Sequence, residues 1–178
     1  MKKEKAINQL NQLKRLVRKN KVRLAAEWPK NQKWKILIST ILSAQSRDEK
    51  TISESIKLYK KYPSLSALSK AKLSDIKKIL KQMNYYKTKS KHILQTAKII
   101  VKRKSIPNNL SDLLKLPGVG RKVGNVYLAV AHNADCIGVD THVARISRKL
   151  GWTENKNPHR IEKDLEALFP KKYWRSIN

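Results

Sequence analysis

Residues 110–133, with the sequence LSDLLKLPGVGRKVGNVYLAVAHN, decide how this chain is expected to fold. Ser111 is suited to cap a first, very short helix, and the pair Pro117-Gly118 ends that helix. Gly120 allows a second tight bend, after which a longer helix begins near Arg121 with its apolar residues on one face. The stretch therefore predicts two helices joined by a short hairpin, LPGVG.

Apolar residues recur at helical spacing through most of the remaining chain. The segments with this spacing are Ile7–Val17, Trp34–Leu42, Ile52–Tyr59, Leu65–Leu68, Ile76–Met83 and Ile93–Val101. Further helix boundaries are expected at Ser74-Asp75, at Asp140, and at Gly151, which is suited to a left-handed cap. No stretch alternates polar and apolar residues as a strand would, so the predicted fold class is all-α.

The charge of the chain points to an anionic partner. Its 178 residues include 41 Lys and Arg against 13 Asp and Glu, a net charge of +28. Nucleic acid is the usual partner of such a surface, because binding to phosphates releases condensed counterions. A membrane surface or an RNA-rich assembly would also satisfy the charge, and an AT-rich genome would raise the lysine content without any binding role. Charge alone does not separate DNA from RNA.

The single cysteine, Cys136, excludes a disulfide framework and any cysteine-based cluster within these residues, and it fits a reducing compartment. The longest apolar-leaning run, Trp34 to Ala44, contains Lys35 and is far too short to cross a membrane. The basic N-terminus lacks the apolar core of a secretory signal. An organelle presequence would fit its low acid content, with Glu4 as the one acid, but the segment is better read as a folded helix. We therefore expect a cytoplasmic protein with no membrane partner.

The hairpin has a chemical property that suits DNA. Its two glycines allow the backbone to approach a phosphate closely, and the N-terminus of the helix that follows favours an anion. Such a contact positions the backbone of DNA and does not read its sequence. An ordinary glycine-rich turn between packed helices is the simpler alternative. The residues expected to bind DNA here are Leu116, Pro117, Gly118, Val119, Gly120 and Arg121.

Lys122 and Asp140 form the candidate catalytic pair. Lysine becomes a nucleophile when its amine loses its proton, and the helix N-terminus and the neighbouring Arg121 both favour that state. Without a partner, Lys122 would be one more surface lysine, and Asp140 before Thr141 would be a helix cap. The two roles of Asp140 are compatible, because backbone amides keep a capping carboxylate ionised and fixed. An extended return over residues 133–138 could bring the two side chains together.

Four blocks of sequence resemble the endonuclease III family of the helix-hairpin-helix glycosylase superfamily. They are LPGVGRKVGNV, VDTHVARI, ILSAQSRD at residues 41–48 and YYKTKSKHI at residues 85–93, and they extend over most of residues 34–151 in the family's order. The resemblance implies a bilobal fold. A helical barrel domain is expected over residues 26–133, with the helix-hairpin-helix at 111–133. A second lobe would combine residues 1–25 with residues 134–178.

The resemblance also implies a base-excision repair enzyme that removes oxidised pyrimidines from duplex DNA and cleaves abasic sites. Lys122 would attack the sugar C1′ and form a Schiff base, Asp140 would assist electrostatically, and β-elimination would cut the strand. Gln45 would fill the gap left by the flipped nucleotide. The other residues expected to contact DNA are Tyr85, Lys89, His142 and Arg145. For His142, a purely structural role or support of Asp140 would fit equally. The expected form is a monomer on the nucleoid DNA of a prokaryote-like cell.

The chain departs from the family pattern at three places. Asn84 and Tyr85 stand where the family usually has a glycine and an aliphatic residue, so the base preference is open. Gly124 replaces a small alanine, a change that we expect to be tolerated. The four cysteines that hold a 4Fe-4S cluster in most members are absent, so no cofactor or metal is expected within this chain. A shortened chain and a branch of the family without the cluster both explain this, and in the first case the second lobe would lack a cover.

Three alternatives share part of this evidence. A non-catalytic helix-hairpin-helix DNA-binding module would use the same hairpin and charge, but it has no need for Lys122 and Asp140. A monofunctional mismatch glycosylase of the same superfamily would usually lack the lysine. A basic RNA-binding or ribosome-associated protein would explain the charge alone.

Overall fold

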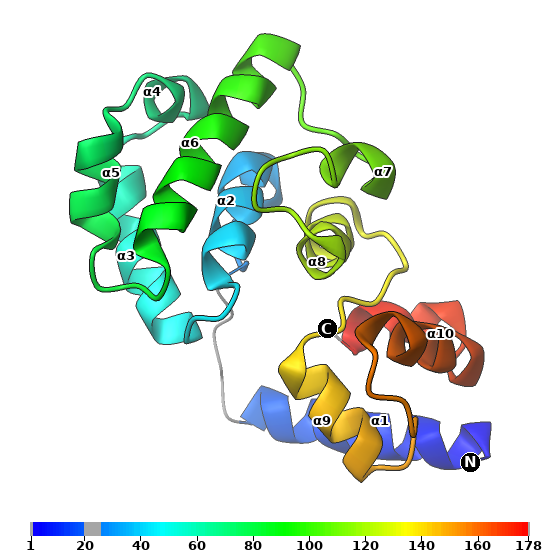
Figure 1. Ribbon diagram of the computed structural model, residues 1–178. Helices are drawn as coiled ribbons and strands as arrows, with labels where there is room; N and C mark the ends of the chain where they lie inside the picture. Colours follow the sequence, from blue (N-terminus) through cyan, green and yellow to red (C-terminus); the bar gives the residue numbers. More distant parts are fainter. Residues whose placement is uncertain (1, 20–25, 178) are drawn as a thin grey trace.

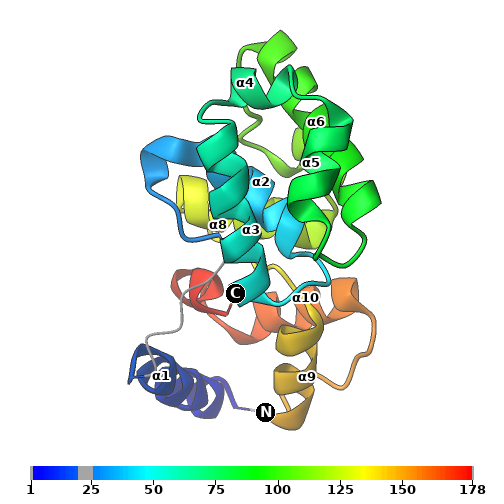
Figure 2. The same ribbon diagram turned by 90° about the vertical axis from the view of Figure 1, so that its left-hand side faces the viewer.

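The computed structural model describes residues 2–19 and 26–177, which form α-helices and short 3-10 helices and contain no strand. The helices gather into two lobes that remain separate in both views (Figures 1 and 2). The all-α, bilobal prediction is confirmed. The predicted domain boundary after residue 25 borders residues 20–25, which lie outside the described residues.

The first lobe is built around a central helix. Its elements are η1 (Lys30–Gln32), α2 (Lys33–Ser43), α3 (Asp48–Lys61), α4 (Leu65–Ser69), α5 (Leu73–Leu80), α6 (Tyr86–Arg103), α7 (Leu110–Leu113) and α8 (Arg121–His132). Every residue from Ile36 to Leu42 is buried. A helix that is buried all round needs neighbours on all sides, and α3, α6 and α8 pack against α2. This arrangement fixes α8, which carries the candidate nucleophile, against the centre of the lobe.

The second lobe joins the two ends of the chain. It consists of α1 (Lys3–Lys19), α9 (Thr141–Lys149), α10 (Pro158–Leu168) and η2 (Lys171–Ser176). Its buried core contains Ala6, Leu10, Ile137, Val139, Trp152, Ile161, Leu165, Phe169 and Ile177. The indole of Trp152 also donates a hydrogen bond of 2.8 Å to Gln9 Oε1, which fixes α1 to the C-terminal half. Within the described part of the chain, no helix is long and apolar enough to cross a bilayer.

Some helix boundaries differ from the prediction. Asn109, and not Ser111, caps α7: its Oδ1 accepts from the backbone N–H of Asp112 at 2.9 Å, and Ser111 Oγ donates to the same oxygen. Helix α5 begins at Leu73, before the predicted Ser74-Asp75 start, and its N-terminus has no side-chain cap. These boundaries shift because propensity alone does not say which of several polar residues reaches the free amides.

The structure explains two of the glycines, one after a helix and one inside a helix. Gly151 follows α9 with a φ of 70°, which confirms the predicted left-handed cap. Gly124 lies inside α8, and a Cβ there would be 2.6 Å from Leu110 Cδ1. The glycine therefore allows α7 and α8 to pack closely, and an alanine at this position would require the flexible Leu110 side chain to move.

Candidate active site

The hairpin between α7 and α8 is held firmly on the first lobe. Leu116 and Val119 point into its core with exposures of 3% and 6%. From α6, Thr96 Oγ1 donates a hydrogen bond of 2.9 Å to the carbonyl of Pro117. Gly118 has a φ of 80°, and a Cβ there would be 2.9 Å from Ile41 Cγ2. Because both apolar side chains are buried, the hairpin presents mainly its backbone to the outside.

Gly120 has a different role from the one predicted. Its φ of −89° and ψ of 178° are extended, so the predicted second tight bend is wrong. A Cβ at Gly120 would meet nothing within 4 Å, and no side chain caps the N-terminus of α8. The N-terminus of α8 therefore has no side-chain cap and no obstruction beside Gly120, and a helix N-terminus favours an anion such as phosphate.

Lys122 and Asp140 lie together at the junction of the two lobes. Lys122 is in the first turn of α8, and its Nζ is 3.7 Å from Asp140 Oδ2 at the start of α9. Both side chains are partly exposed, at 30% and 35%. The segment over residues 133–140, which forms no helix, makes the return that the sequence predicts.

Asp140 uses its two oxygens for different purposes. Oδ1 accepts from the backbone N–H groups of His142 and Val143, both at 2.9 Å, which confirms the predicted helix cap. Oδ2 faces Lys122. The cap fixes the carboxylate in one orientation. Asp140 therefore supplies a stationary negative charge beside the candidate nucleophile.

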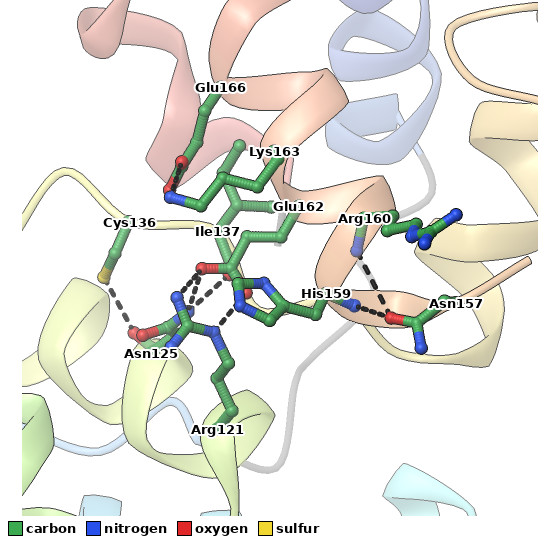
Figure 3. Close-up of polar contacts among 10 residues, drawn as sticks. All are labelled: Arg121, Asn125, Cys136, Ile137, Asn157, His159, Arg160, Glu162, Lys163 and Glu166. Atoms are coloured by element: carbon green, nitrogen blue, oxygen red, sulfur yellow. Dashed lines mark hydrogen bonds and ion pairs between the residues drawn. The ribbon is translucent and has the colours of Figure 1, made fainter. Parts of the chain in front are cut away.

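Arg121 connects the lobes, which the sequence does not predict (Figure 3). Its guanidinium donates two hydrogen bonds of 2.8 Å to Glu162 on α10, and these bonds raise the pKa of Arg121. Glu162 is 4% exposed and also accepts from Asn125 Nδ2 at 3.3 Å. The same amide donates to the carbonyl of Ile137 at 2.7 Å.

This contact gives Arg121 a different role from the predicted one. Its charge is paired with a carboxylate, so it is not a free positive neighbour that favours the neutral amine of Lys122. Its guanidinium is thus bound within the protein, and the predicted contact of Arg121 with DNA stays a prediction. Sequence reasoning missed Glu162 because it belongs to no local motif, and it gave Asn125 no role although this residue lies within LPGVGRKVGNV. Only the side-chain contacts between α8 and α10 bring the two together.

Two exposed loop residues face outward at one edge of the first lobe. Gln45 follows α2 and Tyr85 precedes α6, and both have left-handed backbones with φ of 54° and 55°. Tyr85 is 66% exposed. Such exposure is compatible with the predicted contacts with DNA.

Lys89 does not fit the direct contact with DNA that its sequence block suggests. It is 5% exposed, and burial lowers its pKa to about 8. Its Nζ donates to the Leu42 carbonyl at 2.8 Å and to Ser46 Oγ at 2.7 Å. The ammonium is thus turned into the protein and connects α6 with the loop that contains Gln45.

His142 and Arg145 lie on the exposed face of α9. Arg145 Nη2 is 3.3 Å from His142 Nδ1, and both residues are exposed. Only the backbone of His142, and not its imidazole, is bonded to Asp140. Their placement next to the candidate pair leaves the predicted contact with DNA open to test.

The described residues do not fit a metal cluster. They contain no group of three or more His, Cys, Asp or Glu side chains that could hold a metal ion. Burial raises the pKa of the Cys136 thiol to about 11, and its Sγ donates to the Asn125 carbonyl at 3.1 Å. A protonated, hydrogen-bonded thiol is a poor metal ligand. No step of the chemistry below uses a cofactor.

The fold and the site define the class of this protein. Residues 38–171 match the family model described as HhH-GPD superfamily base excision DNA repair protein. Endonuclease III of Thermotoga maritima is 38% identical over 161 residues, which cover 87% of this chain and 76% of that protein. Endonuclease III of a Synechocystis species is 36% identical over 146 residues, 80% of this chain and 67% of that protein. The chain belongs to the endonuclease III family of base-excision DNA repair enzymes.

Solved structures show the same architecture. A trapped endonuclease III–DNA covalent intermediate superimposes with a TM-score of 0.87 at 26% identity, covering 99% of this chain and 83% of that one. A non-covalent endonuclease III–DNA complex gives a TM-score of 0.88 at 25% identity, with coverage of 99% and 85%. A thermostable thymine-DNA glycosylase has a TM-score of 0.83 at 19% identity, with coverage of 98% and 83%, and shows the shared fold alone.

Proposed function

We propose that this protein is a DNA glycosylase and abasic-site lyase that uses Lys122 as its nucleophile and acts on oxidised pyrimidines in duplex DNA. The observation that carries the proposal is the 3.7 Å contact between Lys122 Nζ and Asp140 Oδ2 beside the uncapped N-terminus of α8. Similarity to a trapped covalent endonuclease III–DNA intermediate supports a covalent mechanism. A module that only bound DNA would gain nothing from this pair.

DNA binding would begin at the hairpin. The amides at the start of α8 bind one phosphate of the damaged strand, since Gly120 leaves them unobstructed. The net charge of +28 strengthens this contact and makes it dependent on salt. The damaged nucleotide then turns out of the stack toward Lys122, and Gln45 and Tyr85 occupy the space that it leaves.

The chemistry follows from the two side chains. Lys122 loses a proton, and its amine forms a bond to C1′ while the bond between C1′ and the base breaks. The base leaves with the electron pair and takes up a proton. Asp140 stabilises the positive charge that develops on the sugar, because its capped carboxylate is already oriented.

Opening of the sugar ring then gives a Schiff base between Lys122 and C1′. This imine acidifies the C2′ proton. Loss of that proton breaks the bond between C3′ and its phosphate oxygen, which cuts the strand on the 3′ side of the lesion. Hydrolysis of the imine releases the sugar fragment and regenerates Lys122. On an abasic site, the amine of Lys122 adds to the C1′ aldehyde and water leaves, which gives the same Schiff base and the same β-elimination.

Borohydride trapping tests this mechanism. The wild type, Lys122→Ala and a control, Lys149→Ala at the exposed end of α9, are mixed with duplexes that contain thymine glycol or an abasic site. We expect the wild type and the control to give covalent adducts on both duplexes and Lys122→Ala to give none. An adduct on the abasic duplex alone would support the lyase and refute the preference for oxidised pyrimidines.

The absence of any adduct, despite binding to DNA that weakens with salt, would refute the covalent mechanism and favour a non-catalytic binding module. We also propose that the protein acts as a monomer on nucleoid DNA. Sedimentation of the free protein and of its complex with a short duplex tests the monomer. A mass of two chains per duplex would contradict it.

A further inference from the structure

The two exposed residues Gln45 and Tyr85 share an unusual backbone. Among the described non-glycine residues, positive φ values occur at Gln45, Tyr85, Lys104 and Asn133. Lys104 and Asn133 end α-helices, where the left-handed conformation is common. Gln45 follows the C-cap of α2, whereas Tyr85 precedes the first residue of α6, where the backbone is normally extended. The strain of a left-handed backbone persists only where the surrounding structure imposes it.

Buried Lys89 holds the loop that contains Gln45. The loop connects α2 and α3, and the Leu42 carbonyl in the last turn of α2 has no later helical N–H to bond. Lys89 Nζ donates to that carbonyl at 2.8 Å and to Ser46 Oγ at 2.7 Å. The two acceptors lie on either side of Gln45 in the sequence. One ammonium group on α6 therefore fixes both ends of the turn.

A second set of contacts joins this loop to the one that contains Tyr85. Asn84 Nδ2 donates to the carbonyl of Gln45 at 3.2 Å, and Lys50 on α3 donates to Gln82 Oε1. Between these contacts lies an open cleft of about 550 Å³ that is lined mostly by polar side chains. Polar links rather than apolar packing thus join the exposed parts of the two loops.

We propose that Lys89 and Asn84 are positioning residues that hold the turn of Gln45 and the turn of Tyr85 as one preformed wedge for entry into duplex DNA. The proposal rests on the function proposed above. A glycine at position 84 could not form the bond to Gln45, so the contact between the two loops depends on the Asn84 side chain.

A preformed wedge should strengthen binding to duplex DNA and should not change the reaction on single strands. Because the two loops are ordered before binding, the complex does not lose the conformational entropy of ordering them. Only a duplex presents a gap and an opposite base for the wedge to enter. Lys122 chemistry on an abasic site in a single strand needs neither. Loss of the wedge should therefore reduce discrimination between gapped and intact duplexes without changing the chemistry.

The test compares Lys89→Met and Asn84→Gly with the wild type and with Lys98→Met, which removes an exposed lysine from the same helix. The first measurement is the ratio of affinities for a duplex with a tetrahydrofuran abasic-site analogue and for the intact duplex. We expect this ratio to fall about tenfold in Lys89→Met and about threefold in Asn84→Gly, and to stay unchanged in Lys98→Met. The second measurement is borohydride trapping on single-stranded abasic DNA, which we expect all four proteins to perform equally.

Each outcome decides the proposal. An unchanged affinity ratio in Asn84→Gly would overturn it, and so would an equal loss of affinity for both duplexes. If Lys89→Met does not fold, the exposed Asn84 gives the answer on its own. Failure of the wild type to form any adduct would refute the proposed function. The affinity ratio does not depend on Lys122 chemistry, so it would still test the wedge.

Discussion

The two hairpin glycines should respond to alanine in opposite ways, and this contrast tests how the site is built. At Gly118, alanine would have a φ of 80° and a Cβ 2.9 Å from Ile41 Cγ2 and 3.0 Å from His92 Cβ. The left-handed backbone costs about 1–2 kcal/mol and the overpacking about 1–3 kcal/mol. Gly118→Ala should therefore lower the free energy of unfolding by about 2–5 kcal/mol. For a chain of this size, the melting temperature should fall by about 4–20 °C.

At Gly120 the expected loss is in binding. The extended backbone accepts alanine and no atom lies within 4 Å of its Cβ, so Gly120→Ala should gain about 0.4–1 kcal/mol of stability. The added methyl group would stand where the phosphate approaches the amides of α8. Loss of a charge-assisted hydrogen bond of about 1.5–3 kcal/mol predicts an affinity about 10–100 times weaker.

Thermal unfolding followed by circular dichroism, and fluorescence anisotropy with an abasic-analogue duplex, measure the two effects. Only Gly118→Ala should melt at a lower temperature than the wild type, and only Gly120→Ala should bind the duplex more weakly. If Gly120→Ala binds DNA like the wild type, the phosphate does not bind at the start of α8. If Gly118→Ala melts with the wild type, the hairpin is more flexible than its contacts indicate.

Three further predictions concern the charged groups. Glu162→Gln should lower the free energy of unfolding, measured in urea, by about 2 kcal/mol. The loss is smaller than for a fully buried ion pair because the Arg121 side chain is 40% exposed. The control Glu166→Gln should change this free energy by under about 0.5 kcal/mol, and equal effects of the two substitutions would contradict the prediction. Asp140→Asn keeps an oxygen for the helix cap, so it should melt like the wild type but react about 10²–10³ times more slowly. Asp140→Ala should react as slowly and also lose about 1 kcal/mol of stability, because the cap is removed. Full activity of Asp140→Asn would exclude an electrostatic role. Burial lowers the pKa of Lys89 to about 8, so the folded state loses this proton at a lower pH than the unfolded state does. The stability of the wild type relative to Lys89→Met should therefore rise between pH 8 and about 10.5. A constant difference in the free energy of unfolding in urea over that range would refute the shift.

Features that depend on neighbours in the sequence were predictable. The helix-hairpin-helix, the cap at Asp140 and the left-handed end at Gly151 each follow from a few adjacent residues whose conformations are restricted. The Lys122–Asp140 pair was predictable too, because a helix and an extended return join the two residues directly. The resemblance to a known family placed both termini in one lobe, which periodicity alone could not do.

Features that depend on distant segments were not predictable. Nothing near Arg121 indicates that Glu162 will occupy its guanidinium, and nothing near Lys89 indicates that its ammonium will be buried. Basic residues in a motif that binds DNA are naturally interpreted as DNA contacts. Only the side-chain contacts between α8 and α10, and the packing of α6 on α2, show that these two side chains bind within the protein.

The contact of Arg121 with Glu162 and Asn125 also limits how this sequence can change over evolutionary time. Arg121 and Asn125 lie on α8 of the first lobe and Glu162 lies on α10 of the second. Glu162 accepts hydrogen bonds from both, so a mutation in one of the three leaves a partner without its hydrogen bond. Positions 121, 125 and 162 should therefore vary together among relatives, although about forty residues separate the first from the last. A homologue that has lost the carboxylate at 162 is expected to have replaced the arginine at 121 as well.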